Sequence, residues 1–378
     1  MANTLTNLIP TAYEALDIVS RELVGLIPSV TRNSTADRVA KDQTLYSPVA
    51  PANTLGDITP AMTVSAASDQ TISTKSVTIS NYKVSGFNWT GEEAYSVDMG
   101  PGVQTIVRDQ IAQCLRAHVN AMELAIATAL TTGCSRAYGT SATTPFATAA
   151  DLSDLAQINK ILDDNGAPRS GRHLVLGTTA SANLRGKQSG LFKVNESGTD
   201  AMLRRGELGN LMNFALHESA QVPVGTTVGT GASYQLNGAH AAGATTIAVD
   251  TGSGTILAGD VVTINSVKYV VLTALSGGNF TINAPGLLTA LSDNTAVTVN
   301  AAHTKNFALA SNAAILATRL PKVGTNDLAS DRQVITDPIS GLSFEFAVYP
   351  GYRMCKYEIA TAYGVSAIKP EHAAVLLG

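Results

Sequence analysis

The sequence is poor in charge and in cysteine, and it contains no long apolar run. Asp, Glu, Lys and Arg make up 14% of its 378 residues, against about 25% in an average soluble protein. No stretch of about 18 consecutive apolar residues occurs, so we expect no transmembrane helix. With so few charges, the chain is expected to bury much of its surface against other subunits, because interface cores are depleted in charge. The alternative is a large monomer rich in Ala, Gly and Thr.

The sequence also has no cluster of basic residues and few cysteines, and each of these features excludes a class of protein. The net charge is −4 and there is no basic block, which argues against a dedicated nucleic-acid binder. Only three cysteines occur, far apart, as expected for free thiols in a reducing cytoplasm. The N-terminal segment has no basic start and carries Glu14 and Asp17, so we do not expect a signal peptide there.

Apolar residues at three- and four-residue steps predict two amphipathic helices, over 10–27 and 103–132. The first is either an arm that reaches a neighbouring subunit or a helix packed on its own domain. The second is the longest in the chain, roughly 45 Å at 1.5 Å per residue, and is expected to form the spine of an elongated domain. Between them, 72–89 predicts long antiparallel strands with a bulge near Gly86, in a protruding β arm.

The rest of the sequence predicts a mixed α/β region that is interrupted by a block containing strands but no helices. Helices are expected over 151–168, 178–186 and 199–211, strands over 173–177 and 213–219, a helix over 306–321, a hairpin over 332–349, and a closing strand over 354–377. From 222 to 303 the sequence contains only strand and turn signals, typical of a small barrel or sandwich. This all-β block is therefore expected to be an insertion.

One motif suggests catalysis. Asp250-Thr-Gly-Ser follows an apolar strand, as in the catalytic loop of aspartic proteases. That reaction needs two carboxylates that share a proton, and the chain has one such loop, so the second would come from a homodimer. Because the same residues form turns, we expect a hairpin turn in which Asp250 bonds backbone or solvent and has no carboxylate partner.

We expect no catalytic, cofactor or metal site. The six histidines show no ligand spacing with Cys, Asp or Glu, and no complete phosphate-binding or dinucleotide-binding glycine motif is present.

The candidate functional residues are instead those of subunit contacts. The pairs Glu92-Glu93 and Arg204-Arg205 either bind between subunits, where opposite charges fix register, or are solvated. The full set of candidate interface residues is Tyr13, Leu16, Trp89, Glu92, Glu93, Arg204 and Arg205.

The order of these parts resembles the major capsid (coat) protein of tailed bacteriophages, in particular the short-tailed type with an inserted β domain. Three stretches carry the resemblance: LRRGELGNLMNFALHESAQVP (203–223), NFALASNAAILATRLP (306–321) and YGVSAIKPEHAAVLLG (363–378).

The resemblance implies an α+β fold shared with the herpesvirus capsid floor, with an N-terminal arm, a long β-hairpin loop, a spine helix and an all-β insertion domain. The implied parts are an N-terminal helical arm (1–34), an extended β loop (35–98), a spine helix and peripheral domain (99–150 with 352–378), an axial mixed α/β domain (151–221 with 304–351) and an inserted small β-barrel (222–303).

The resemblance also implies a structural role without catalysis. Copies would form hexamers and pentamers that close into an icosahedral shell around phage double-stranded DNA. A scaffolding protein would template the procapsid and leave, DNA entry would drive expansion, and the shell would contact a portal protein and, non-specifically, the DNA. The chain would assemble in the host bacterial cytoplasm and end in the virion, without contact to a membrane. The alternatives are a homodimeric aspartic protease using Asp250 and another phage structural protein, such as a tail component.

Overall fold

The computed structural model describes residues 14–16, 25–49, 60, 62, 73–93, 103–187, 209–225, 227–325, 327–337 and 341–378. The candidate residues Tyr13, Arg204 and Arg205 lie outside these ranges, as do most of the helix expected over 10–27 and residues 199–208 of the helix expected over 199–211.

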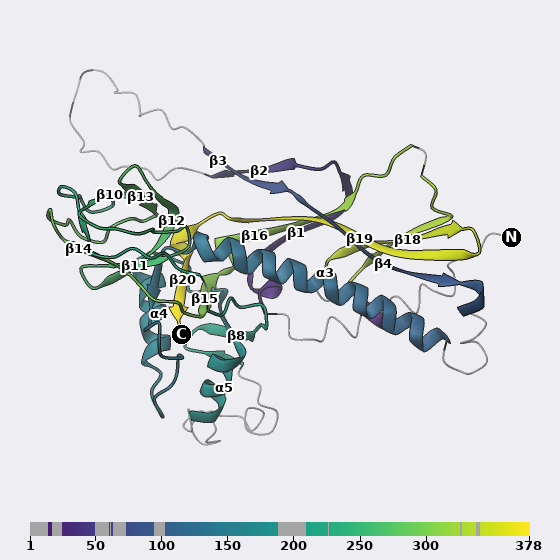
Figure 1. Cartoon of the computed structure of the whole chain (residues 1–378), viewed down its shortest axis with the longest axis horizontal. Helices are drawn as coiled ribbons and strands as arrows, with labels where there is room; N and C mark the ends of the chain where they lie inside the picture. The colour runs from purple at the N-terminus through teal and green to yellow at the C-terminus, as the bar shows by residue number, and fades with distance from the viewer. Residues whose placement is uncertain are drawn as a thin grey trace.

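The long helix is confirmed as α3 (Val103–Gly133). Its apolar face is buried from Val107 to Leu130, with Ile111, Leu115, Met122 and Ile126 completely covered. Figure 1 shows α3 along the long axis of the molecule, beneath strands of the first sheet. The largest hydrophobic core lies between this helix and the sheets that cover it.

The first sheet has six strands. In order these are β1 (Thr31–Val39), β16 (Ala314–Pro321), β19 (Met354–Ala367), β18 (Ser343–Gly351) and β17 (Asp331–Thr336), and β4 (Asn81–Thr90) pairs with the opposite edge of β19. Only β1 and β16 run parallel. The hairpin expected over 332–349 is confirmed as β17 and β18.

The strands of the expected protruding arm do not pair as the sequence predicts. β2 (Gln43–Val49) and β3 (Ser73–Ile79) form a separate two-stranded ribbon, whereas β1 and β4 belong to the six-stranded sheet. The bulge expected near Gly86 is wrong, because β4 pairs with β19 in unbroken register. A Cβ on Gly86 would lie 2.4 Å from the carbonyl oxygen of Tyr357, so this glycine permits close backbone approach instead.

The second sheet combines the mixed region with the all-β block. Outside the all-β block, its strands are, in order, β5 (Arg136–Tyr138), β20 (Ala373–Leu377), β15 (Lys305–Ala310), β6 (Arg172–Leu176), β8 (Phe214–Glu218) and β7 (Asn210–Leu211). Helices α4 (Ser153–Asp164) and α5 (Thr178–Lys187) contribute to a second core on this sheet. Short 3-10 turns lie at η2 (Ile27–Ser29), η4 (Ser311–Ala313) and η5 (Pro370–His372).

The helix expected over 306–321 is wrong, because this stretch forms β15 and β16. All six residues of β15 are buried. A strand buried on both faces loses the alternation that marks a half-exposed strand, so its run of Ala and Leu resembled a helix. The closing strand expected over 354–377 is two strands, β19 and β20, separated by η5.

The all-β block closes on itself. Its strands are β9 (Tyr234–Leu236), β10 (Thr246–Asp250), β11 (Val261–Ile264), β12 (Val267–Ser276), β13 (Asn279–Ile282) and β14 (Ala296–Val299). They pair in the ring β11-β14-β9-β10-β13-β12, and β12 pairs back to β11. This ring has its own hydrophobic core, and β12 also pairs with β5, which joins the ring to the second sheet.

Candidate subunit-contact surface

Leu16 is the one residue of the predicted N-terminal contact that the structure describes. Its side chain is 2% exposed and packs in the core around α3. Of the two alternatives for this segment, packing on its own domain is therefore the one favoured at Leu16.

Trp89, Glu92 and Glu93 lie together, where β4 ends in a helical turn over 91–93. Trp89 Nε1 donates a hydrogen bond of 2.7 Å to Gln110 Oε1 on α3, which fixes the indole ring. Glu93 Oε2 accepts hydrogen bonds from the backbone N–H and the hydroxyl of Thr90, and the Thr90 hydroxyl accepts from the Glu93 N–H. This reciprocal capping lowers the pKa of Glu93 and engages its carboxylate locally. Glu92 is exposed, as Glu93 is.

A hollow of about 810 Å³ opens between the end of β4 and the β18–β19 hairpin. Its lining includes Trp89, Glu92, Pro350, Tyr352, Met354 and Tyr357. Gly351 pairs with Met354, so Tyr352 and Arg353 form a two-residue turn at the hairpin tip. Tyr352 is 90% exposed. Sequence reasoning missed this surface because its two walls are far apart in the chain, although Gly351-Tyr-Arg between two strand patterns was a turn signal.

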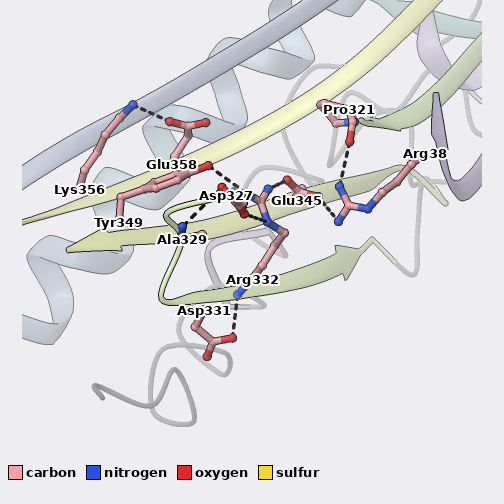
Figure 2. Close-up of polar contacts among 10 residues, drawn as sticks. All are labelled: Arg38, Pro321, Asp327, Ala329, Asp331, Arg332, Glu345, Tyr349, Lys356 and Glu358. Carbon is pink, nitrogen blue, oxygen red and sulfur yellow. Dashed lines mark hydrogen bonds and ion pairs between the residues drawn. The ribbon is translucent and has the colours of Figure 1, made fainter. Parts of the chain in front are cut away.

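A network of charged side chains lies behind the hairpin (Figure 2). Glu345 on β18 is 2% exposed. Its Oε2 lies 2.5 Å from Arg38 Nη2, in an ion pair without the angles of a hydrogen bond, and its Oε1 pairs with Arg332. Arg332 also pairs with Asp327 and donates a hydrogen bond of 3.0 Å to the Tyr349 hydroxyl. Since Arg38 comes from β1 and Arg332 from β17, Glu345 links two of the edge strands of this sheet.

The same network continues toward the hairpin tip through Tyr349. The guanidinium carbon of Arg332 lies 5.9 Å from the centre of the Tyr349 ring, and Lys356 Nζ lies 5.8 Å from it. Lys356 also pairs with Glu358 at 2.5 Å. The strands that lead to the tip are therefore held by charge contacts as well as by backbone pairing.

A second buried carboxylate, Glu123 on α3, ties two distant segments to the helix. It accepts hydrogen bonds from the backbone N–H groups of Leu26 and Ile27, at 2.9 and 2.6 Å, and from the Ser219 hydroxyl at 2.8 Å. Burial raises the pKa of Glu123, and these hydrogen bonds partly offset that rise. Sequence reasoning missed this role, because a lone Glu in a helix gives no sign of distant partners.

Asp250 ends β10, but the expected hairpin turn is wrong. β10 pairs with β9 and β13 rather than with the strand that follows it. The Asp250 carbonyl accepts a 2.6 Å hydrogen bond from the N–H of Gly252. Asp250 Oδ1 is buried and accepts no hydrogen bond from the described residues, so the expected bond to backbone is not made by this oxygen.

The glycines of the Asp250 loop serve packing. A Cβ on Gly252 would lie 2.3 Å from the ring of Tyr234, and the Tyr234 hydroxyl donates a 2.9 Å hydrogen bond to the carbonyl of Gly254. The Asp-Thr-Gly-Ser sequence, which resembles a protease motif, is therefore explained by packing: the loop folds under an aromatic ring of the barrel.

Two histidines meet on neighbouring strands. The Ser311 hydroxyl donates to the carbonyl of Gly171, so His173 Nε2 donates to Ser311 Oγ at 3.1 Å, and His173 Nδ1 accepts from His217 Nε2 at 3.0 Å. Burial, and then the neighbouring His173, lower the pKa of His217 to about 4. In the described part of the chain, no three His, Cys, Asp or Glu side chains are grouped to hold a metal ion. No helix there is long and apolar enough to cross a membrane.

Comparison with known proteins identifies the fold. No family model and no curated protein matches the sequence. Among solved structures, a chain from the capsid of the cyanophage P-SCSP1u is similar with a TM-score of 0.51 and 10% identity, covering 92% of this chain and 86% of that chain. A chain from Mycobacterium phage Che8 is similar with a TM-score of 0.50 and 15% identity, covering 89% and 85%.

The chain therefore has the fold of phage capsid proteins, built from mixed helices and sheets. The resemblance to tailed-phage major capsid proteins is confirmed at the level of the fold. These similarities give no support to the aspartic-protease alternative.

Proposed function

We propose that this chain is the major capsid protein of a tailed phage, which assembles as hexamers and pentamers into an icosahedral shell around double-stranded DNA. The observation that carries the proposal is the capsid fold along about nine-tenths of the chain. The low content of charge agrees with it independently, because surfaces that bury against copies of the same chain are depleted in charge.

The shape of the subunit also supports assembly. The β2–β3 ribbon projects from the molecule near the barrel (Figure 1). The base of the ribbon packs on the first sheet through the buried Val77 and Ile79, whereas its far end, at Tyr46, Pro48 and Thr74, is exposed. Because a two-stranded ribbon is marginally stable in water on its own, a neighbouring subunit beneath the far end would supply the packing that this subunit does not.

The further partners follow from the proposed role. A scaffolding protein would template the procapsid, a portal protein would occupy one vertex, and packaged DNA would contact the inner face without sequence preference. Assembly would take place in the host cytoplasm, and the mature chain would reside in the virion. The division into arm (1–34), β loop (35–98), peripheral, axial and barrel parts, and the kinship with the herpesvirus capsid floor, belong to the same proposal.

Electron microscopy of the expressed chain, alone and with a scaffolding protein from the same genome, tests the proposal. Closed shells or capsid-like sheets are the expected result. Tubes or uniform small oligomers would instead favour a tail component. A cleavage assay with Asp250→Asn as the control addresses catalysis, since proteolysis lost in that variant would contradict a purely structural role.

A further inference from the structure

We propose that the β18–β19 hairpin tip of one copy enters the hollow beside Trp89 of a second copy, where Arg353 pairs with Glu92. The inference rests on the proposed function, because it names one contact between assembling subunits. Its occupant is a second copy of this chain.

The side chains at the tip and hollow are of the types that dominate binding energy. Tyr352 is 90% exposed and Met354 is 37% exposed, and Trp89 and Tyr357 line the hollow. Aromatic residues, Met and Arg are enriched in interface cores, and Trp, Tyr and Arg are the commonest hot-spot residues. The hollow, at about 810 Å³, is large enough to receive the tip of a hairpin.

The backbone of the tip is strained in a way that presents these side chains. Arg353 has φ +56°, in the left-handed region that residues other than glycine rarely adopt. The guanidinium carbon of Arg353 lies 5.8 Å from the centre of the Tyr352 ring, so the two side chains project as one unit. Strain of this kind concentrates at functional sites, and a Gly at this position of the turn would remove it.

The hairpin is also organised before any partner binds. Tyr349, directly before Pro350, lies between Arg332 and Lys356, and Arg332 is fixed by Glu345 and Asp327 (Figure 2). An element already rigid loses less conformational entropy on association, so more of its contact energy appears as affinity.

Charge complementarity indicates that a second copy is the occupant. Glu92 is exposed on one wall of the hollow and Arg353 lies on the other. Within the described residues neither side chain has an ion-pair partner. Because the patch carries both signs, a second copy that faces it brings Arg353 against Glu92, and such pairs set the register of symmetric contacts.

A charge-swap series in the full-length chain tests this contact. Arg353→Glu and Glu92→Arg should each raise the concentration needed for assembly at least roughly tenfold, because each places like charges together. The double variant Glu92→Arg with Arg353→Glu should return assembly to within about twofold of the original chain. Lys160→Glu, at an exposed position of α4, changes net charge by the same amount as Arg353→Glu and should assemble normally. Sedimentation velocity with negative-stain microscopy gives the readout, and thermal unfolding verifies the fold of each variant.

A cross-link separates failure of the contact from failure of shell assembly. In a Cys355→Ser background, chains with Glu92→Cys are mixed with chains with Arg353→Cys and treated with a short, flexible bismaleimide, because an Arg–Glu pair holds the two Cα atoms farther apart than a disulfide can span. A cross-link between the two chains is expected even in oligomers that never close. Absence of this product, single reversals that assemble normally, or a folded double variant that is not rescued would each overturn the contact, whereas absence of shells with the product present would overturn only the proposed function.

Discussion

At the scale of single residues, the chain places its few charges where they join distant segments. Glu345 links β1 to β17 through Arg38 and Arg332, and Glu123 holds the N–H groups of Leu26 and Ile27 against α3. A buried carboxylate is costly unless its partners compensate it. Its value here is that it joins segments far apart in the chain.

Glu345→Gln is expected to lower the free energy of unfolding by about 3 kcal/mol, because it leaves two arginines beside a neutral buried amide. Urea unfolding measures the loss. Glu358→Gln is the matched control: its partner Lys356 is 46% exposed, so its removal should cost less than about 1 kcal/mol. If the two variants lose the same free energy of unfolding, burial of Glu345 does not make its ion pairs more stabilising than an exposed pair.

The His173–His217 pair predicts a dependence on pH. The pKa of His217 is lowered to about 4 in the folded chain, so between an unfolded pKa of about 6.5 and that value the unfolded chain binds the extra proton. Stability is therefore lost as the pH falls through this interval. Unfolding of the original chain and of His217→Gln, compared at pH 7, 5.5 and 4.5, should show the original chain losing stability relative to the variant. A difference that does not change with pH would contradict the assignment.

At the scale of elements, glycines mark the places where strands cross closely. A Cβ on Gly364 of β19 would lie 2.2 Å from the carbonyl oxygen of Thr78. The β2–β3 ribbon therefore leaves the sheet over a backbone contact that no side chain interrupts.

Gly364→Ala is expected to cost about 2 kcal/mol, as overpacking does, and to loosen β3. Hydrogen exchange over residues 73–79, read with overall stability, detects both effects. For Gly91→Ala we expect almost no change, since a Cβ there meets no atom within 4 Å. Unaltered exchange in β3 of the Gly364 variant would mean that the ribbon is held elsewhere.

Elements were predictable from sequence where one face is exposed. α3 shows its apolar stripe at helical spacing because its other face is exposed, and β17–β18 flanks a clear turn signal. The sequences of β15 and β16 instead favour a helix, because their covered faces hide the strand period. The sequence offers Trp89 and Glu92 as candidate contact residues but not Tyr352, because pairing between β4 and β19 brings the walls of the hollow together and no local pattern encodes it.

At the scale of the whole molecule, the barrel is fixed to the end of the spine helix. Asn283 Nδ2 donates hydrogen bonds of 2.6 and 2.7 Å to the carbonyl oxygens of Thr132 and Cys134. The buried Lys305 donates to the carbonyl of Gly259 in the barrel, and burial lowers the pKa of Lys305 to about 8. Orientation of the barrel thus depends on polar contacts at one end of α3.

Asn283→Ala should cost about 2 kcal/mol, because it leaves two carbonyl groups without their donor. It should also raise hydrogen exchange at the junction, in residues 130–134 and 279–283, more than in the barrel interior. The exposed Asn279→Ala is the comparison and should stay within about 0.5 kcal/mol of the original chain. Uniform exchange changes through the barrel would point to general destabilisation instead.

The closed ring of the barrel has one further consequence, for the way in which copies of this chain can meet. An open sheet offers unpaired backbone groups on which identical chains polymerise in endless ribbons. Each of the six barrel strands has neighbours on both sides. The all-β block therefore presents no unpaired edge of its ring to another copy, and any contact that it makes with another copy is made by side chains.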